Sequence, residues 1–429
     1  MHDSAPADHA PLQMMRAAVY SKFGGPITIQ DIPYPQLPPD GVIIKVKATG
    51  VCRSDWHGWK GHDDDIKTHG IEHGFVPGHE VSGIIVQISK GATKHQIGDR
   101  VVVPFILSCG ACRECHRSRP TVCEDQTQPG FTMLGSFAEY LAVPRSDRNL
   151  CELPENVGFC EAAALGCRFT TAYRAVIQQG QLGSAAIIAN DDTSNASSRS
   201  TTNTAPTADD DDPDNNNTAL LDSSICKSVA IFGAGGLGLS CIMIAKSIDI
   251  DSNMQIIAVD VSDQALQKAV ELGATHTINV LVHDSSSSST NNNVQSRIAQ
   301  MTNGIGVDLA IDAAGFKSTC ENAVLCTRRG GRMVQVGLPI GHSSPPIVDM
   351  GRVAARELEI VGSHGMAASD MSSVLQLVSS GKLDPKKLVE REVDVEEGAA
   401  AIMAMDHGSP VGITMVTSFG VRANGPSRL

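Results

Sequence analysis

Residues 228–238, SVAIFGAGGLG, decide the fold of the second half of this 429-residue chain. A short apolar run, typical of a buried strand, leads into Gly-x-Gly-x-x-Gly at Gly233, Gly235 and Gly238. Asp260 follows 22 residues after Gly238 and ends the next apolar run. A glycine pattern alone is a weak signal. A strand before it, a helix after it and an acid at the end of the next strand together predict a dinucleotide-binding βαβ unit.

Each residue of this loop has a separate physical task. Gly233 permits the tight turn, Gly235 lets the backbone approach a pyrophosphate, and Gly238 allows close packing between helix and strand. Gly236 and Leu237 begin the helix, whose free N–H groups stabilise phosphate charge. The alternative is a glycine-rich turn with a purely structural role, which the flanking pattern disfavours.

The acid after the next strand indicates which coenzyme is bound. Asp260 can accept hydrogen bonds from the ribose hydroxyls of an adenosine, and it would repel a 2′-phosphate. Residues 261–263 are Val-Ser-Asp, so no basic side chain follows the acid directly. The sequence therefore predicts NAD rather than NADP.

The same pattern extends outward to the rest of the second half. Short apolar strands are expected at 228–232, 256–260, 276–279, 307–312, 333–336 and 358–361. Helix-like segments separate most of them, such as the segment that Ser262 caps and Gly273 ends. This alternation predicts an α/β domain of the doubly wound Rossmann type, with a parallel sheet covered by helices on both faces.

The first half of the chain has a different pattern. Residues 42–48 alternate as in a half-buried strand, and residues 81–89 and 101–105 continue an all-β pattern. Residues 161–178 are expected to form a helix that leads out of this region. The chain is therefore expected to hold two domains, the first rich in β-strands and the second α/β.

Two polar segments interrupt the second domain. Residues 190–218 hold seven Asp and one Arg, and residues 284–293 are rich in Ser and Asn. Such segments cannot bury apolar surface, so both are predicted to be disordered surface inserts without chemistry of their own. The first insert carries nearly half of the chain's net charge of −13.

The overall composition argues against several classes of protein. Lys and Arg number 34 and Asp and Glu number 47, whereas a general nucleic-acid binder needs a basic face. No apolar run reaches the roughly 18 residues of a membrane span. The N-terminus lacks the pattern of a secretory signal. The expectation is a cytoplasmic protein with neither a nucleic-acid nor a membrane partner.

Twelve cysteines are an unusual number for such a chain. Cys109, Cys112, Cys115 and Cys123 are separated by two, two and seven residues, and this spacing can surround one tetrahedral zinc with four thiolates. A closed four-sulfur site leaves no position for a substrate, so this zinc would be structural. The alternative is a cluster of free thiols, which seldom has such spacing.

Cys52, His79 and Cys167 are candidates for a second metal site. They lie in Gly-Val-Cys-Arg-Ser-Asp-Trp-His, Pro-Gly-His-Glu and Leu-Gly-Cys-Arg, respectively. Two cysteines and a histidine with a fourth position left open are the pattern of a catalytic zinc. Each residue alone is more often a buried core residue, and sequence spacing does not show that the three converge.

These motifs, in this order, resemble the zinc-dependent alcohol dehydrogenases of the medium-chain dehydrogenase/reductase superfamily. The resemblance runs from about residue 15 to about residue 416, with the two inserts as interruptions. It implies a GroES-like β-barrel catalytic domain that the chain leaves and later rejoins. The expected segments are a disordered tail at 1–14, the catalytic domain at 15–172 with its zinc lobe at 109–123, the NAD-binding domain at 173–361, and a C-terminal catalytic segment at 362–429.

The resemblance also implies roles for individual residues. Cys52, His79 and Cys167 become the ligands of the catalytic zinc. The implied catalytic residues are Glu80 as a carboxylate near the metal, Asp55 as the carboxylate that orients the ligating histidine, and Ser54 and His57 as a proton relay. The coenzyme contacts that the resemblance adds to the glycine loop and Asp260 are Arg53, Thr171, Val336 and Gly337.

One position departs from the family's pattern. Many members carry a basic residue five positions after the acid that binds the ribose, and here that residue is Ala265. Lys268 lies one turn further along the expected helix. This departure concerns the strength of coenzyme binding and not the preference for NAD.

The expected function is the reversible transfer of hydride from an alcohol to NAD, which gives an aldehyde or a ketone. Two zinc ions per chain and a homo-oligomer, dimer or tetramer, are implied by the resemblance. Two alternatives stay open. One is a polyol or secondary-alcohol dehydrogenase or a carbonyl reductase of the same superfamily. The other is a non-catalytic, zinc-stapled nucleotide-binding protein, which would be expected to have lost Cys52, Ser54, His79 or Cys167.

Both tryptophans of the chain, Trp56 and Trp59, lie close to Cys52 in sequence. One interpretation makes them the wall of a pocket for an apolar substrate. The other makes them filling between the barrel and a neighbouring loop. The sequence favours neither.

Overall fold

The computed structural model describes residues 13–182, 228–249, 253–281, 293–339, 345–408 and 410–420. The insert predicted at 190–218 lies outside these residues, as does all but the last residue of the insert predicted at 284–293. Of the expected N-terminal tail, residues 13 and 14 are described. Met14 already belongs to the first strand, β1 (Met14–Val19).

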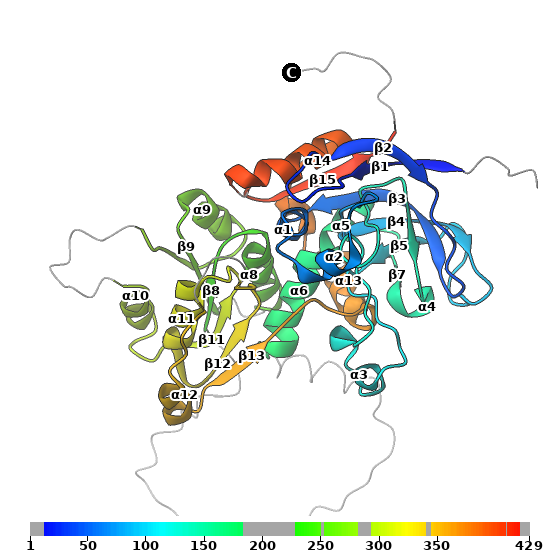
Figure 1. The fold of residues 1–429 in the computed structure, drawn as a ribbon. Coiled ribbons are helices and arrows are strands. Elements are labelled where there is room, and N and C mark those ends of the chain that lie inside the picture. Colours follow the sequence, from blue (N-terminus) through cyan, green and yellow to red (C-terminus); the bar gives the residue numbers. More distant parts are fainter. Residues whose placement is uncertain are drawn as a thin grey trace, which may run out of the picture.

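A six-stranded parallel sheet forms the second half of the chain, in the strand order β10-β9-β8-β11-β12-β13 (Figure 1). Its strands are β8 (Ser228–Phe232), β9 (Gln255–Asp260), β10 (His276–Asn279), β11 (Val307–Asp312), β12 (Thr327–Gln335) and β13 (Glu359–Gly362). The predicted doubly wound fold is confirmed. Strand β12 is longer than expected, because it begins at Thr327 rather than at residue 333.

Helices cover both faces of this sheet. They are α8 (Gly236–Ile248), α9 (Asp263–Glu271), α10 (Val294–Met301), α11 (Lys317–Cys326) and α12 (Met350–Arg356). The side chains of β8 divide between two apolar cores, with Val229 and Ile231 in one and Ala230 and Phe232 in the other. A strand buried on both faces explains why β8 is a continuous apolar run.

A second sheet contains strands from both ends of the chain. Its order is β14-β15-β3-β4-β5-β7, with β6 also paired to β3, while β1 pairs with β2. The strands are β2 (Thr28–Pro33), β3 (Val42–Val51), β4 (Val81–Ile88), β5 (Arg100–Val103), β6 (Tyr140–Val143), β7 (Cys151–Glu152), β14 (Val389–Asp394) and β15 (Ile413–Ser418). Because β15 pairs with β3, the C-terminal segment completes this sheet.

Short helices connect and cover the strands of the second sheet. They are α1 (Arg53–Trp59), α2 (Asp64–His69), α3 (Arg113–His116), α4 (Ser146–Asn149), α13 (Met371–Ser379) and α14 (Val395–Ala404). Four 3₁₀ turns join them, namely η1 (Pro120–Val122), η5 (Ala368–Asp370), η6 (Pro385–Leu388) and η7 (Met405–His407). Among the described residues, no helix is long and apolar enough to cross a membrane.

The helix expected at 161–178 forms without a break, but it alternates between α and π turns. The chain forms α5 (Phe159–Ala164), a π-helical turn η2 (Leu165–Phe169), α6 (Thr170–Tyr173) and a second π-helical segment η3 (Arg174–Gln179). The N–H of Thr170 donates to the carbonyl of Leu165, five residues back, which is the mark of a π turn. Helix α6 lies between the two sheets in Figure 1, and its Ala172 shares one core with Val102 and Ile231.

Candidate active site and metal centres

The three predicted zinc ligands come together from three separate segments. Cys52 lies between β3 and α1, His79 lies just before β4, and Cys167 lies in the π turn η2. Together with Glu80, they place one ligand atom each so that all four atoms lie within 4.8 Å of one another. All but Cys167 are buried.

Asp55 orients His79, as the resemblance implied. Its Oδ1 accepts a hydrogen bond of 2.8 Å from Nδ1 of His79 and one of 3.1 Å from the N–H of Gly78, and its Oδ2 accepts from the N–H of Cys52 at 2.9 Å. This pairing leaves Nε2 of His79 buried without a hydrogen-bond partner among the described residues. An unpartnered imidazole nitrogen that faces two thiols is what a zinc ligand requires.

The charges and hydrogen bonds around these residues shift their pKa values in different directions. Burial lowers the pKa of His79, but the carboxylate of Asp55 outweighs it, so the pKa is raised well above its ordinary value. A hydrogen bond from Cys167 holds the pKa of Cys52 well below its ordinary value. The same hydrogen bond raises the pKa of Cys167. The pocket therefore favours one thiolate, the form of cysteine that binds zinc.

Arg168 is a residue of this site that the sequence analysis missed. Its side chain is 7% exposed, and it forms an ion pair of 2.5 Å with Glu80, which is fully buried. A second nitrogen donates to the carbonyl of Val51 at 2.5 Å. Burial raises the pKa of Glu80, and the charge of Arg168 opposes that rise. A charged residue within the apolar stretch 162–172 was the available signal.

Arg168 also contacts the glycine loop of the Rossmann domain. A Cβ atom placed on Gly236 would lie 2.7 Å from Nε of Arg168. The arginine therefore lies between Glu80, beside the metal ligands, and the first residue of α8. The π turn η2 thus contributes both a candidate metal ligand, Cys167, and this arginine.

The predicted relay residues lie in α1. His57 is half-buried, and its Nδ1 lies 3.1 Å from Nδ1 of His62. Burial, and then the charge of Arg53, lower the pKa of His57 to about 4. The ordinary value of about 6.5 therefore does not apply to this side chain. Ser54 is also only partly buried.

Arg53 and the two tryptophans form a cluster beside the relay. The guanidinium of Arg53 lies 3.6 Å from the centre of the Trp56 ring and donates to the carbonyl of Met405 at 2.7 Å. Trp56 donates to Asp406, whereas Trp59 is buried and donates to the carbonyl of Gly25. Trp59 is thus core filling, and Trp56 is held at the edge of α1.

Two aromatic rings lie near His79, the histidine predicted to bind zinc. The rings of Phe105 and Phe131 lie 5.9 Å and 5.1 Å from that of His79, and His364 lies 5.5 Å from Phe105. Both phenylalanines are almost fully buried. The sequence analysis did not single out these residues, because no spacing rule connects them with His79.

The glycine loop has the shape that the motif predicted. Gly233 has a φ of +95°, which favours glycine, and a Cβ on Gly238 would lie 1.7 Å from the carbonyl oxygen of Gly233. A Cβ on Gly235 would meet no atom within 4 Å, so open space remains where a pyrophosphate would approach. The loop therefore fits a dinucleotide.

Asp260 lies at the end of β9 against this loop. Its carboxylate accepts from the N–H groups of Ala234, Val261 and Ser262 at 2.6 to 2.9 Å. Lys268 does not reach it from the next helix, because Lys268 forms an ion pair of 2.9 Å with Glu390 of β14.

The remaining predicted coenzyme residues lie on three separate elements. Leu237 lies in the first turn of α8, Thr171 is buried in α6, and Val336 and Gly337 follow β12 directly. Asp312, a buried residue that the sequence analysis missed, lies at the end of β11. It accepts from the N–H groups of Ala314 and Gly315 and from the amide of Gln335.

The four cysteines of the lobe form a second candidate metal centre. Their sulfurs all lie within 4.8 Å of one another, and the sulfurs of Cys112 and Cys123 are 3.7 Å apart. Tetrahedral zinc with bonds of about 2.3 Å would separate two sulfurs by about 3.8 Å. None of the four forms a disulfide. The lobe thus fits a closed zinc site.

Two family models match the chain. Residues 38–155 match the alcohol dehydrogenase GroES-like domain, and residues 236–380 match the zinc-binding dehydrogenase domain. The chain belongs to the zinc-type alcohol dehydrogenases of the medium-chain superfamily. Both domains of this dehydrogenase are therefore the ones that the resemblance implied.

Individual relatives are similar to this dehydrogenase over nearly its whole length. An NAD-dependent alcohol dehydrogenase from Sulfurisphaera tokodaii is 28% identical and covers 93% of this chain and 98% of its own length. Sorbitol dehydrogenase from Bacillus subtilis is 27% identical over 91% and 93% of the two chains. The solved structure of alcohol dehydrogenase TADH from Thermus sp. ATN1 matches with a TM-score of 0.73 and 28% identity, over 94% of this chain and all of that one.

Proposed function

We propose that this protein is an NAD-dependent zinc dehydrogenase that oxidises an alcohol to an aldehyde or a ketone, and that it also runs in reverse. The observation that carries the proposal is the convergence of Cys52, His79 and Cys167 around the unpartnered Nε2 of His79. The NAD dependence that the Sulfurisphaera enzyme's name states supports the coenzyme, as does the acid at Asp260.

The chain's own residues have distinct tasks in this reaction. When bound at Cys52, His79 and Cys167, zinc would supply a Lewis acid that makes a nearby alcohol more acidic, and NAD would accept the hydride. Asp55 holds His79 in the tautomer that presents Nε2. Ser54 and His57 would carry the released proton toward solvent. With a pKa of about 4, His57 is neutral near pH 7, so it would pass the proton on to solvent and not retain it.

We propose that each chain binds two zinc ions. One ion would bind at the catalytic site and one at the four-cysteine lobe, since each cluster has the donors that zinc prefers. The unpaired cysteines of the described residues also suit a reducing compartment such as the cytoplasm, which we propose as the location.

A homo-oligomer is part of the proposal. Among the described residues, the edge strand β13 pairs only with β12. Large apolar side chains are exposed on or near it, namely Ile360 at 42%, Met350 at 65% and Ile347 at 73%. An open strand edge bordered by exposed apolar side chains favours pairing with a second copy.

The test removes one ligand at a time. His79→Ala and Cys167→Ala are expected to abolish alcohol-dependent NADH formation and to lower the zinc content by one ion per chain. Cys241→Ala serves as the control, because Cys241 is buried in the Rossmann core and belongs to neither cluster. Undiminished turnover in the ligand variants would refute the proposal. A wild-type content of one zinc per chain would instead favour the non-catalytic nucleotide-binding protein.

A polyol dehydrogenase is the second candidate, supported by the similarity to sorbitol dehydrogenase. The aromatic rings of Phe105 and Phe131 beside His79 favour an apolar alcohol over a polyhydroxylated one. Initial rates with benzyl alcohol and with sorbitol distinguish the two candidates, because the aromatic wall predicts a higher kcat/KM for benzyl alcohol.

A further inference from the structure

A cavity of about 250 Å³ lies at the end of the parallel sheet opposite the coenzyme loop. It forms where α10 and the loop after it meet the start of β12 and the end of α12. The glycine loop follows the carboxyl end of β8, whereas this cavity lies at the amino ends of β11 and β12. It is therefore separate from the site of the dehydrogenase reaction.

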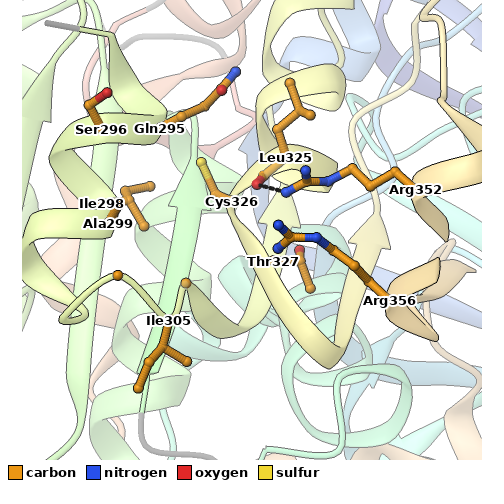
Figure 2. Close-up of a pocket in the computed structure, with 12 residues that line it drawn as sticks. Gln295, Ser296, Ile298, Ala299, Ile305, Leu325, Cys326, Thr327, Arg352 and Arg356 are labelled. Carbon is orange, nitrogen blue, oxygen red and sulfur yellow. Dashed lines mark hydrogen bonds between the residues drawn. The ribbon is translucent and has the colours of Figure 1, made fainter. Parts of the chain in front are cut away.

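One side of the cavity is basic and the other is apolar. Figure 2 shows the guanidinium groups of Arg352 and Arg356 extending from α12 toward Cys326 and Thr327. Ile298 and Ile305 lie on the opposite side. The lining includes no Asp or Glu.

No acidic side chain lines this cavity, and the carboxylate of Asp349 at the start of α12 attracts Arg352 from outside the lining. Arg352 donates to the carbonyl of Leu325 at 2.6 Å, but its Nε is buried without a partner. The guanidinium of Arg356 makes no hydrogen bond or ion pair with any residue that the structure describes. Burial lowers the pKa of Arg352. The positive charge of Arg356 lowers it further, because the two cations repel each other across the cavity.

A structural role explains only part of this arrangement. Arg352 donates a hydrogen bond to a backbone carbonyl at the end of α11. The positive charge of Arg356, in the last turn of α12, interacts favourably with the negative end of the helix dipole. Neither effect requires both guanidinium groups to face one cavity. An anion in the cavity would relieve their repulsion and would take up the free donors.

We propose that this cavity binds a phosphate monoester that carries a small apolar group. A phosphate monoester has close to two negative charges near pH 7, which match the two guanidinium groups, and its oxygens accept the paired N–H bonds that arginine donates. The apolar side formed by Ile298 and Ile305 would contact the rest of the ligand.

Calorimetric titration of the full-length protein with phenyl phosphate tests the proposal. Saturating NADH is present throughout, so that the probe cannot bind at the coenzyme loop. We expect one saturable site per chain, weakened about tenfold or more in Arg356→Gln, since a charge-assisted contact is lost. Arg356 has no contact to lose in the free protein, so this variant should fold normally.

Two controls sharpen the result. Arg113→Gln makes the same charge change at an exposed arginine of the four-cysteine lobe, away from the cavity, and is expected to leave the affinity unchanged. Benzoate, with one charge, is expected to bind more weakly than phenyl phosphate. Equal binding in wild type and Arg356→Gln, or no saturable binding in the presence of NADH, would overturn the proposal. Because the alcohol assay is separate, neither result depends on the proposed dehydrogenase activity.

Discussion

A buried ion pair connects the metal ligands with the coenzyme loop. Arg168 bonds to Glu80 and to the carbonyl of Val51, and it packs against Gly236. A buried carboxylate is costly unless it is paired, and Arg168 is the cation that pairs with Glu80. The same guanidinium therefore stabilises a charge beside the zinc site and supports the start of α8.

Breaking this pair is expected to destabilise the protein. Arg168→Met leaves Glu80 buried without its partner, which costs about 3–5 kcal/mol in the free energy of unfolding. The double variant Glu80→Gln with Arg168→Met should recover part of that loss, because no charge is left buried. Urea unfolding measures both. Arg113→Met, at an exposed arginine, should change stability by no more than about 0.5 kcal/mol. A similar small change in Arg168→Met would contradict the role of the pair.

His57 is expected to make stability depend on pH. Its pKa in the folded protein is about 4, below the ordinary value of about 6.5 in an unfolded chain. The unfolded chain therefore binds the proton more readily, and folding stability falls as the pH drops from about 6.5 toward about 4. The loss in urea midpoint between about pH 7.5 and about pH 5 should be smaller in His57→Gln than in wild type. An identical loss in both proteins would show that His57 does not contribute.

At the scale of elements, the π turn η2 has the largest effect on the site. A regular α-helix through residues 165–169 would rotate Cys167 and Arg168 relative to the residues that follow them. In the π turn, the side chain of Cys167 lies near Cys52 and that of Arg168 pairs with Glu80. Helix α6 then continues into the core between the sheets.

The four-cysteine lobe is a second local element, and its stability is expected to depend on its metal. Few of its residues are buried: helix α3 has none and turn η1 has Thr121. Cys112→Ser should lose one zinc per chain and should become sensitive to proteolysis near residues 109–123, since little else holds the lobe. NADH affinity should not change, because the lobe lies outside the Rossmann sheet. Cys151→Ser, at a cysteine outside both clusters, is the control. Retention of both zinc ions in Cys112→Ser would exclude the lobe as a zinc site.

At the scale of the whole molecule, the active site depends on how the two sheets are joined. Cys52 and His79 belong to the barrel, the glycine loop belongs to the Rossmann sheet, and α6 lies between them (Figure 1). One apolar core includes Val102 of the barrel and Ile231 of the Rossmann sheet. This continuous core fixes the distance between the metal ligands and the coenzyme loop.

The open edge of the Rossmann sheet leads to a prediction about assembly. Ile360→Arg places a charge on the exposed face of β13 and is expected to shift the protein to a smaller species in sedimentation velocity, because the apolar edge no longer pairs. Lys382→Arg, at an exposed position elsewhere, should leave the species unchanged. A wild-type protein that sediments as a monomer would contradict the proposed oligomer.

Much of this architecture could be predicted from local patterns. The glycine loop and the Rossmann strands follow from periodicity and spacing, because each depends on residues that are near one another in the chain. The four-cysteine lobe is also local, since one short loop supplies all four ligands. Residues such as Phe105 and Arg168 were missed because their neighbours at the site come from distant segments.

The sequence by itself determined the fold class, the coenzyme loop and the types of residue available for zinc. Only the tertiary structure decided that Cys52, His79 and Cys167 meet, that Arg168 pairs with Glu80, and that two arginines of α12 face one cavity. The physical reason is the range of the interactions. Helix and strand patterns reflect neighbours along the chain, whereas metal coordination and buried charge pairing depend on distances that only the packed core sets.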